Sequence, residues 1–304
     1  MDFTLTGEQV ALRDAVREAL GANTSWEKLA AMGVFGTVVP ESLGGLGLTD
    51  VDAVPLLTEF GYAAAPWPAA ETLAVVAPLV AACGDPDSIM SGATRVAVAN
   101  GDMVVPYGRD ADLVLVLGDG VAHLVPATGD PVSTVDLSRA AINIAEPVGA
   151  PLTSDAALVE LARDRATLAA AAQLVGLSRR MLELTVGYVK QRRQFGVAVG
   201  SFQAVKHHLA NALLRLEFAE PPVLAAGWAI ASSASSRAAD VSMAAVLASE
   251  AARFTARTAI QCHGAMGYTV EYELHRFAKR AWALAAGCDL DAHLERLGGI
   301  FDDG

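Results

Sequence analysis

The stretch SDAALVELARDRATLAAAAQLVGLSRRMLELTVGYVKQ, residues 154–191, decides the fold of this 304-residue chain. It is rich in Ala and Leu and contains no proline. We predict one helix of roughly 37 residues, ~55 Å long. A small domain cannot leave a helix of that length unsupported, so neighbouring helices must bury it.

Further long helices follow. Ser201 is expected to cap a second helix, residues 238 to about 263 predict a third, and one or two shorter helices follow Glu273. Helices of this kind predict a bundle. Pro221 and Pro222 fall inside the second helix. Because two prolines remove two amide donors and clash with the preceding turn, we expect a break or a sharp kink there.

The first ~90 residues have the end signals of short helices. Residues 6–9 form a capping-box sequence, a second helix runs from near Ser25 to Gly33, and an Asp50-capped helix follows a glycine-rich loop. These signals predict a helical domain over residues 1–92.

Between residues 93 and 150 the apolar spacing becomes strand-like. Residues 113–117 and 121–125 flank Gly118-Asp119-Gly120, which predicts a hairpin. We therefore predict a mainly α fold with a reduced antiparallel β domain over residues 93–152. A C-terminal four-helix bundle is expected over residues 153–304.

The composition excludes several classes of function. A formal charge of −12 makes nucleic acid an unsuitable partner, and no apolar stretch reaches the ~20 residues that a membrane span requires. Three scattered cysteines form neither a disulfide framework nor a thiolate metal site. We expect a cytoplasmic protein without a metal.

Two segments combine polar groups, glycine and aromatic residues at helix ends. They are Arg192-Arg193-Gln194-Phe195-Gly196 with Ser201-Phe202-Gln203, and Gln261-Cys262-His263-Gly264-Ala265-Met266-Gly267-Tyr268. Each has an ordinary explanation, because basic residues and glycine favour helix C-termini. The glycines can equally let bare backbone approach a phosphate-bearing ligand.

Taken together and in this order, the two segments resemble the acyl-CoA dehydrogenase family. Its members carry an R-x-x-F-G…Q element and, later, a Q-x-x-G-G-x-G-Y/F element. Arg192, Phe195, Gly196 and Gln203 match the first, and Gln261, Gly264, Gly267 and Tyr268 match the second, with Ala265 replacing the middle glycine. The loop VPESLGGLGLT, residues 39–49, also resembles the family's first domain.

The resemblance implies FAD, held at a subunit interface. In the family these motifs grip the adenosine-diphosphate half of a flavin that a neighbouring subunit mainly binds. Carried over residue by residue, this assigns cofactor binding to Arg192, Phe195, Gln203, Gln261, Gly264 and Gly267. A guanidinium suits a diphosphate because it offers a planar fork of charged donors. The implied partner is a longer catalytic subunit or a second copy of this chain, and the implied substrate is an acyl-CoA.

The family's catalytic glutamate has no counterpart at the expected positions. Counting from the motifs places it at Cys288 or at Ala166, and neither is a carboxylate. The family's T-E-P-x-A-G-S-D-like β-domain motif is also missing from residues 92–112. The chain thus resembles the short, non-catalytic subunit of actinobacterial α2β2 acyl-CoA dehydrogenases, which typically oxidise steroid side-chain CoA thioesters. We expect no catalytic residue in it.

Three interpretations remain open at this point. In the first, the chain completes the FAD site of a catalytic partner. In the second, it is a homomeric acyl-CoA dehydrogenase that uses another carboxylate such as Asp289, although a helix cap is the simpler role at that position. In the third, it is a flavin-free scaffold or acyl-CoA-binding module with the same fold.

Overall fold

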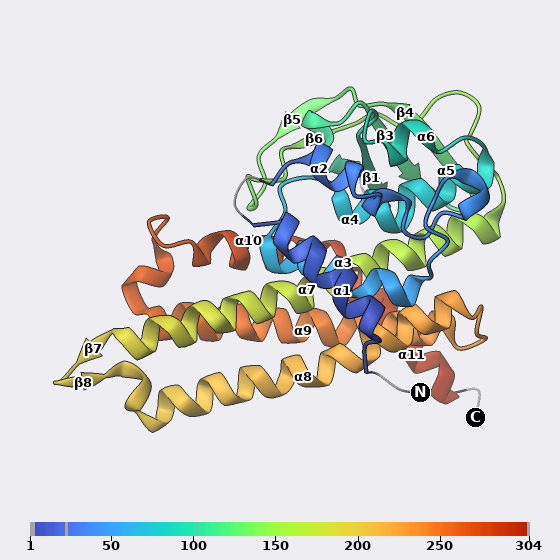
Figure 1. Cartoon of the computed structure of the whole chain (residues 1–304). Helices are drawn as coiled ribbons and strands as arrows, with labels where there is room; N and C mark the ends of the chain where they lie inside the picture. Colours follow the sequence, from blue (N-terminus) through green and yellow to red (C-terminus); the bar gives the residue numbers. More distant parts are fainter. Residues whose placement is uncertain (1–3, 22–23, 102, 303–304) are drawn as a thin grey trace.

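The computed structural model describes residues 4–21, 24–101 and 103–302. Long helices run across the molecule, and the N-terminal helices and the β region pack over one end of them (Figure 1). At the other end, α7 and α8 project together and are joined by the β7–β8 hairpin. The predicted fold class, mainly α with a small β region, is confirmed.

The N-terminal region consists of short helices. They are α1 (Gly7–Ala19), α2 (Trp26–Ala31), α3 (Asp50–Ala63), α4 (Ala69–Glu71), α5 (Ala77–Cys83) and α6 (Asp87–Met90). The capping box at Thr6 is present, because its side chain accepts from the Gln9 N–H at 3.2 Å.

The predicted cap of α3 is wrong by one residue. The N-cap is Thr49, whose backbone N–H donates to the Asp52 carboxylate at 2.9 Å. Asp50 is buried instead and accepts from Arg165 of the long helix at 2.7 Å. A charged side chain at a helix start is thus used for a tertiary ion pair.

Two small sheets form the β region. One has the order β1 (Val96–Asn100), β3 (Leu113–Leu117), β4 (Ala122–Pro126), and the other β2 (Val104–Val105), β6 (Ala141–Asn143), β5 (Asp130–Val132). The predicted hairpin is confirmed, with Leu117 opposite Ala122. The antiparallel prediction is wrong for β1 and β3, which run parallel. The segment between them, which includes β2, crosses over before the chain returns, and alternating spacing does not reveal strand direction.

Four helices form the C-terminal bundle, and a fifth packs on it. They are α7 (Ala156–Gln191), α8 (Gln203–Ala231), α9 (Arg237–His263), α10 (Leu274–Gly287) and α11 (Leu290–Asp302). The continuous long helix is confirmed. Ser201 does not cap α8, because its hydroxyl donates to the Ala198 carbonyl and closes a 3-10 turn before the helix begins. Among the described residues, no helix combines the length and the apolar character that a membrane crossing needs.

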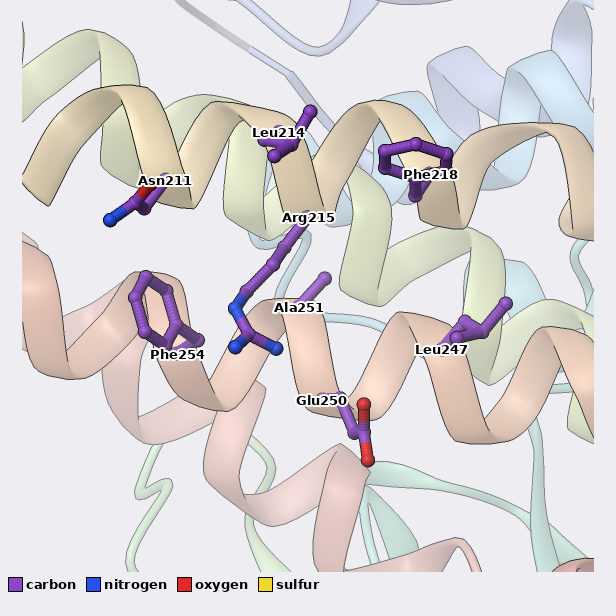
Figure 2. A pocket seen from close by; sticks show the side chains of 8 residues that line it. All are labelled: Asn211, Leu214, Arg215, Phe218, Leu247, Glu250, Ala251 and Phe254. Carbon is purple, nitrogen blue, oxygen red and sulfur yellow. The ribbon is translucent and has the colours of Figure 1, made fainter. Parts of the chain in front are cut away.

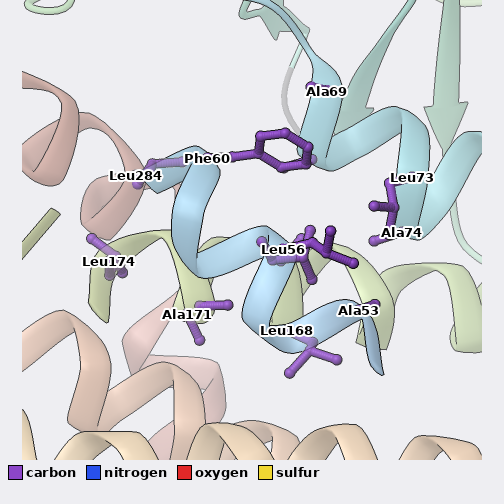
Figure 3. Packing of buried hydrophobic residues seen from close by; sticks show 14 of the residues in the cluster. Ala53, Leu56, Phe60, Ala69, Leu73, Ala74, Leu168, Ala171, Leu174 and Leu284 are labelled. Atoms are coloured by element: carbon purple, nitrogen blue, oxygen red, sulfur yellow. The ribbon is translucent and has the colours of Figure 1, made fainter. Parts of the chain in front are cut away.

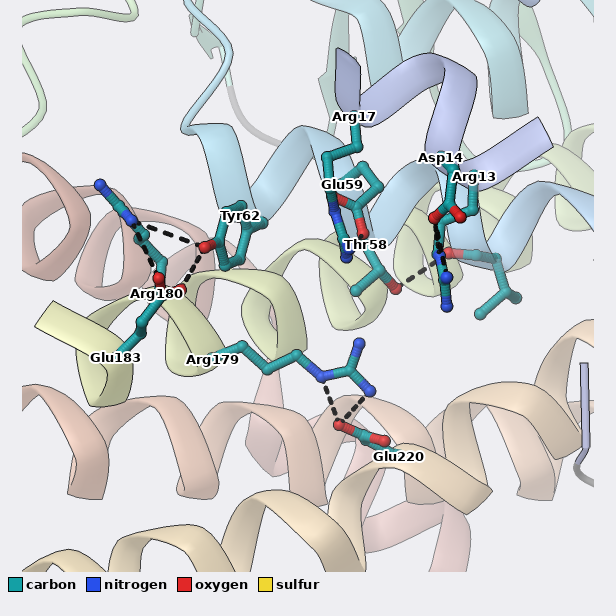
Figure 4. Close-up of polar contacts among 11 residues, drawn as sticks. Arg13, Asp14, Arg17, Thr58, Glu59, Tyr62, Arg179, Arg180, Glu183 and Glu220 are labelled. Carbon is teal, nitrogen blue, oxygen red and sulfur yellow. Dashed lines mark hydrogen bonds and ion pairs between the residues drawn. The ribbon is translucent and has the colours of Figure 1, made fainter. Parts of the chain in front are cut away.

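We expected a break or a sharp kink at Pro221 and Pro222, and there is no break, because α8 passes through both prolines without interruption. Packing on either side holds this segment. Ala219 and Val223 are buried, and Glu220 accepts from Arg179 of α7 at 2.7 Å (Figure 4). Tertiary contacts therefore outweigh the local cost of the two prolines.

Helices α3 and α7 cross with their backbones in contact. A Cβ at Gly61 would lie 2.1 Å from the Gln173 carbonyl oxygen, and a Cβ at Gly176 would lie 1.9 Å from the Thr58 carbonyl oxygen. In the surrounding core Leu56 of α3 lies beside Leu168 of α7, and Phe60 of α3 points towards Ala69 of α4 (Figure 3). The two glycines thus allow the N-terminal region to seat directly on the long helix.

Arg280 of α10 joins all three parts of the chain. Its side chain is 1% exposed. It forms a very short ion pair with Asp136, and it donates to Ser138 Oγ and to the Ala65 carbonyl, both at 2.9 Å. Burial alone would raise the pKa of Asp136, but Arg280 and the Ser138 hydrogen bond hold that pKa below its ordinary value.

Candidate cofactor site

A cavity of about 340 Å³ opens where the end of α7 meets the turn that follows α9. Arg192, Gln261 and Gly264 all line it. The predicted residues come from two segments about 70 positions apart in the sequence. The fold therefore brings half of the predicted site together.

Arg192 ends α7, and the β7–β8 hairpin holds it in place. Its backbone leaves the helix in an extended conformation, and its carbonyl accepts from the Val199 N–H at 2.8 Å. β7 (Arg193–Gln194) and β8 (Val197–Ala198) pair across Phe195 and Gly196, which have φ of 51° and 81°. Two successive left-handed residues form the tight turn typical of a two-residue hairpin.

The electrostatics of the cavity suit an anion. None of the residues that line it is acidic, and they include Arg192, Gln194 and Gln261. Within the described part of the chain, the exposed Arg192 guanidinium has no ion-pair partner. Its donors are therefore free for a ligand.

The two motif glycines have different surroundings. Gly264 has φ of 59° and ψ of −135°, and a Cβ built on it would meet nothing within 4 Å. Only glycine adopts this conformation readily, and the open space lets a ligand reach the backbone. A Cβ on the buried Gly267 would lie 2.7 Å from the Ile260 carbonyl oxygen, so this glycine is required by packing.

Three of the six predicted residues lie outside the lining of the cavity. They are Gly267, Phe195 and Gln203. Phe195 is 92% exposed at the hairpin tip and has an edge contact with Phe202, with ring centroids 6.4 Å apart. Gln203 is exposed at the first turn of α8.

An aromatic cluster that the sequence analysis did not predict lies beside Arg192. The His263 ring stacks on Tyr188, with centroids 4.3 Å apart, and lies 4.8 Å from the Tyr272 ring. His263 Nδ1 contacts the Ala259 carbonyl at 2.7 Å. Burial lowers the pKa of His263, so the ring is neutral at neutral pH. The sequence does contain one indication of this cluster, because Tyr188 lies four residues before Arg192 and therefore on the same face of the helix.

The candidate positions for a catalytic base all lie outside this cavity. Ala166 packs against the core. Cys288 is buried, and burial raises the pKa of its thiol. The Asp289 carboxylate accepts from the Ala292 N–H at 3.1 Å, which is the helix-capping role.

Comparison with known proteins identifies the class. Residues 7–88 match the N-terminal domain of acyl-CoA dehydrogenases, and residues 155–287 match the C-terminal domain. The acyl-CoA dehydrogenase IpdE2 of Mycobacterium tuberculosis is 33% identical over 89% of this chain and 84% of its own length. The chain therefore belongs to the acyl-CoA dehydrogenase family, a family of oxidoreductases. The predicted domain boundaries stay a prediction, and their outermost residues, 1–3 and 303–304, lie outside the described part.

Solved structures agree with this assignment. The ChsE4–ChsE5 complex of Mycobacterium tuberculosis has a chain with a TM-score of 0.83 and 24% identity over the full length of both chains. The steroid acyl-CoA dehydrogenase Tcur3481–Tcur3483 gives 0.83 at 25% identity, with 99% of each chain covered. PigA, solved with FAD, gives 0.85 at 19% identity and 99% coverage of each chain. Membership of the family supports FAD as the cofactor, and these solved structures share the fold.

The residues of the cavity fit one part of FAD. A guanidinium and two side-chain amides are donors that suit a diphosphate, and the space left open at Gly264 lets a ligand approach, while the Gly264 N–H itself is bonded to the Gln261 and Ile260 carbonyls. The neutral His263 ring adds no charge at the site.

Proposed function

We propose that this chain is the shorter subunit of an FAD-dependent acyl-CoA dehydrogenase. It completes the FAD site of a longer catalytic partner, which supplies the base. The observation that carries the proposal is the cavity itself, where Arg192, Gln261 and Gly264 converge while Ala166, Cys288 and Asp289 lie elsewhere.

Each residue has a defined part in this proposal. Arg192 binds phosphate oxygens, Gln261 donates its amide, and Gly264 lets the diphosphate approach the backbone. Tyr188 and His263 form a rigid wall that fixes the end of α7 against the end of α9. FAD held there and in the partner would supply the acceptor for the hydride that leaves the β-carbon of the acyl thioester, and the partner's base would take the α-proton.

Exposed apolar side chains at and near the β7–β8 hairpin support the proposal that this chain binds a partner subunit. Phe195, Val197 and Phe202 are exposed apolar side chains beside the cavity. Apolar side chains gathered in this way mark contact surfaces. They would pack against the partner that holds the flavin ring.

The substrate and assembly are parts of the same proposal. We infer a bulky acyl-CoA thioester, with the steroid side-chain class favoured by the steroid enzyme Tcur3481–Tcur3483. We infer an α2β2 assembly from the resemblance and from the ChsE4–ChsE5 complex. The cytoplasmic location stays a prediction.

Co-expression with a longer acyl-CoA dehydrogenase chain from the same host tests the proposal. We expect a yellow, active complex, and little flavin on this chain when it is expressed alone. A stable but colourless complex would instead favour the flavin-free scaffold. Bleaching of this chain alone by an acyl-CoA, lost in Asp289→Asn, would favour the homomeric enzyme.

Matched variants test the role of Arg192. Arg192→Ala removes charge-assisted hydrogen bonds of about 1.5–3 kcal/mol, so FAD affinity should fall roughly 10- to 150-fold. Arg193→Ala is the control, because Arg193 lies outside the cavity lining and donates only to the Gly196 carbonyl at 3.4 Å. Equal flavin retention in the two variants would contradict the assignment.

A further inference from the structure

Two of the hollows in the surface outside the candidate cofactor cavity differ sharply in character. A groove of about 440 Å³ between α8 and α9 is lined mostly by apolar side chains such as Leu214 and Leu247 (Figure 2). The arginine that lines it, Arg215, stacks over the Phe254 ring at 4.4 Å. The other hollow, of about 270 Å³, is instead lined by three arginines. Cations gathered around one hollow attract an anionic ligand, so this hollow is the candidate for a second binding site.

The second hollow, which we call the arginine hollow, lies where the ends of α1 and α3 meet α7 and the first turn of α10. Arg17 reaches it from α1, Arg180 from α7 and Arg276 from α10, and the rings of Tyr62 and Phe277 lie between them. It shares no lining residue with the candidate cofactor cavity. Because its side chains come from helices far apart in the sequence, the hollow exists only in the folded chain.

One of the three arginines is firmly paired within the protein. Arg17 Nε and Nη2 donate to the Glu59 carboxylate at 2.9 and 2.6 Å (Figure 4). The Glu59 side chain is only 1% exposed, so it cannot leave Arg17 without being buried as an unpaired charge. The two charges therefore balance each other.

Arg180 is shared among several acceptors. Its guanidinium donates to the Tyr62 hydroxyl at 3.5 Å and to the Glu273 carboxylate at 3.3 Å. Glu183 lies 3.7 Å from the same guanidinium and accepts from the Tyr62 hydroxyl (Figure 4). The Glu273 side chain is 42% exposed and caps no backbone N–H of α10. An exposed pair of this kind contributes little stability, so Glu273 can give way to an anion from solution.

Arg276 carries the charge that the hollow leaves unbalanced. Its exposed guanidinium lies over the Phe277 ring at 5.9 Å, and within the described ranges it forms no ion pair. It belongs to the first turn of α10, where the helix end adds partial positive charge. Once Glu273 turns away, the other two arginines keep one glutamate each. The charge of Arg276 then has no counterpart within the hollow.

We propose that the arginine hollow binds a phosphate group, either as free phosphate or as the end of a nucleotide. A phosphate presents oxygens in several directions, which suits guanidiniums that converge from α1, α7 and α10. In the structure Glu273 holds Arg180, and the phosphate takes its place. The inference is independent of the proposed function, because it uses none of the residues of the candidate cofactor cavity.

Titration calorimetry of the full chain with inorganic phosphate, AMP and adenosine tests this site. The measurements use the Arg192→Ala background, so that the main phosphate donor of the candidate cofactor cavity is absent. We expect phosphate and AMP to bind, adenosine not to bind, and the affinity to fall as NaCl is raised. Equal affinities for phosphate and AMP identify free phosphate as the ligand, and tighter binding of AMP identifies a nucleotide.

Three exposed side chains provide variants whose effects differ in direction. Arg276→Gln removes charge-assisted hydrogen bonds, so phosphate should bind at least ~10-fold more weakly. Glu273→Gln removes the competing carboxylate, so phosphate should bind up to ~5-fold more tightly. Arg109→Gln is the matched control, because Arg109 is an exposed arginine of the β region, and it should leave the affinity unchanged. Circular dichroism should show the same fold in all three variants.

Four results would overturn the inference. They are a chain that binds neither phosphate nor AMP, an Arg276→Gln variant that binds as before, a Glu273→Gln variant that binds no more tightly, and an Arg109→Gln variant that loses as much affinity as Arg276→Gln. If phosphate fails to bind here while Arg192→Ala still loses FAD, this site is removed and the proposed function stays intact. If Arg192→Ala keeps its FAD while phosphate binds as described, the reverse holds.

Discussion

Adding one methyl group at the α3–α7 crossing should destabilise the protein, although alanine is the better helix former. A Cβ at position 176 would lie 1.9 Å from the Thr58 carbonyl oxygen and 2.6 Å from the Tyr62 backbone nitrogen. Both are backbone atoms, so α3 must move away from α7. Overpacking of this kind costs about 1–3 kcal/mol or more, against a helix-propensity gain of up to ~1 kcal/mol.

Gly187 on the same helix provides the control. Nothing lies within 4 Å of a Cβ at this exposed position, so Gly187→Ala should stabilise by up to ~1 kcal/mol. Urea unfolding of the full chain, followed by circular dichroism, measures both variants. The two substitutions should change the free energy of unfolding in opposite directions. A Gly176→Ala variant as stable as Gly187→Ala would refute the close crossing, and with it the way the N-terminal region is seated.

Three further predictions concern other parts of the molecule. Arg280 holds the pKa of Asp136 below its ordinary value of 3.8, so this pair stabilises the fold above that pH, and the stabilisation is lost as pH falls through the lowered pKa. Asp136→Asn should lower the free energy of unfolding by about 3–5 kcal/mol at neutral pH. In the variant, the free energy of unfolding should also fall less steeply at acid pH than in the wild type. Iodoacetamide should modify the exposed Cys83 first and the buried Cys288 last, as mass spectrometry can show, since burial also raises the pKa of the Cys288 thiol. Phe195→Ala should leave the melting temperature of this chain within about 1 °C but weaken its association with the partner, which titration calorimetry would detect.

The helices could be predicted well because their signals are local. The long helix was expected from residue 154 and begins at Ala156, and the capping box at Thr6 is present. Errors arose where distant residues decide the outcome. Arg179 of α7 pairs with Glu220 next to the two prolines of α8, which stays one continuous helix, and Arg165 draws Asp50 into an ion pair.

The candidate site could be predicted only in part, for the same reason. Motif spacing identified Arg192, Gln261 and Gly264, which the fold brings to one cavity. A motif does not show whether a glycine serves a ligand or the protein's own packing. Gly267 packs against Ile260, and the stacking of His263 on Tyr188 depends on two helices meeting at their ends.

The most direct test of the central claim is a structure of the co-purified complex with FAD bound. The account predicts the FAD diphosphate within ~3.2 Å of the Arg192 guanidinium, with the flavin ring held in the longer chain. An Arg192 side chain that faces solvent while the diphosphate binds elsewhere would contradict it.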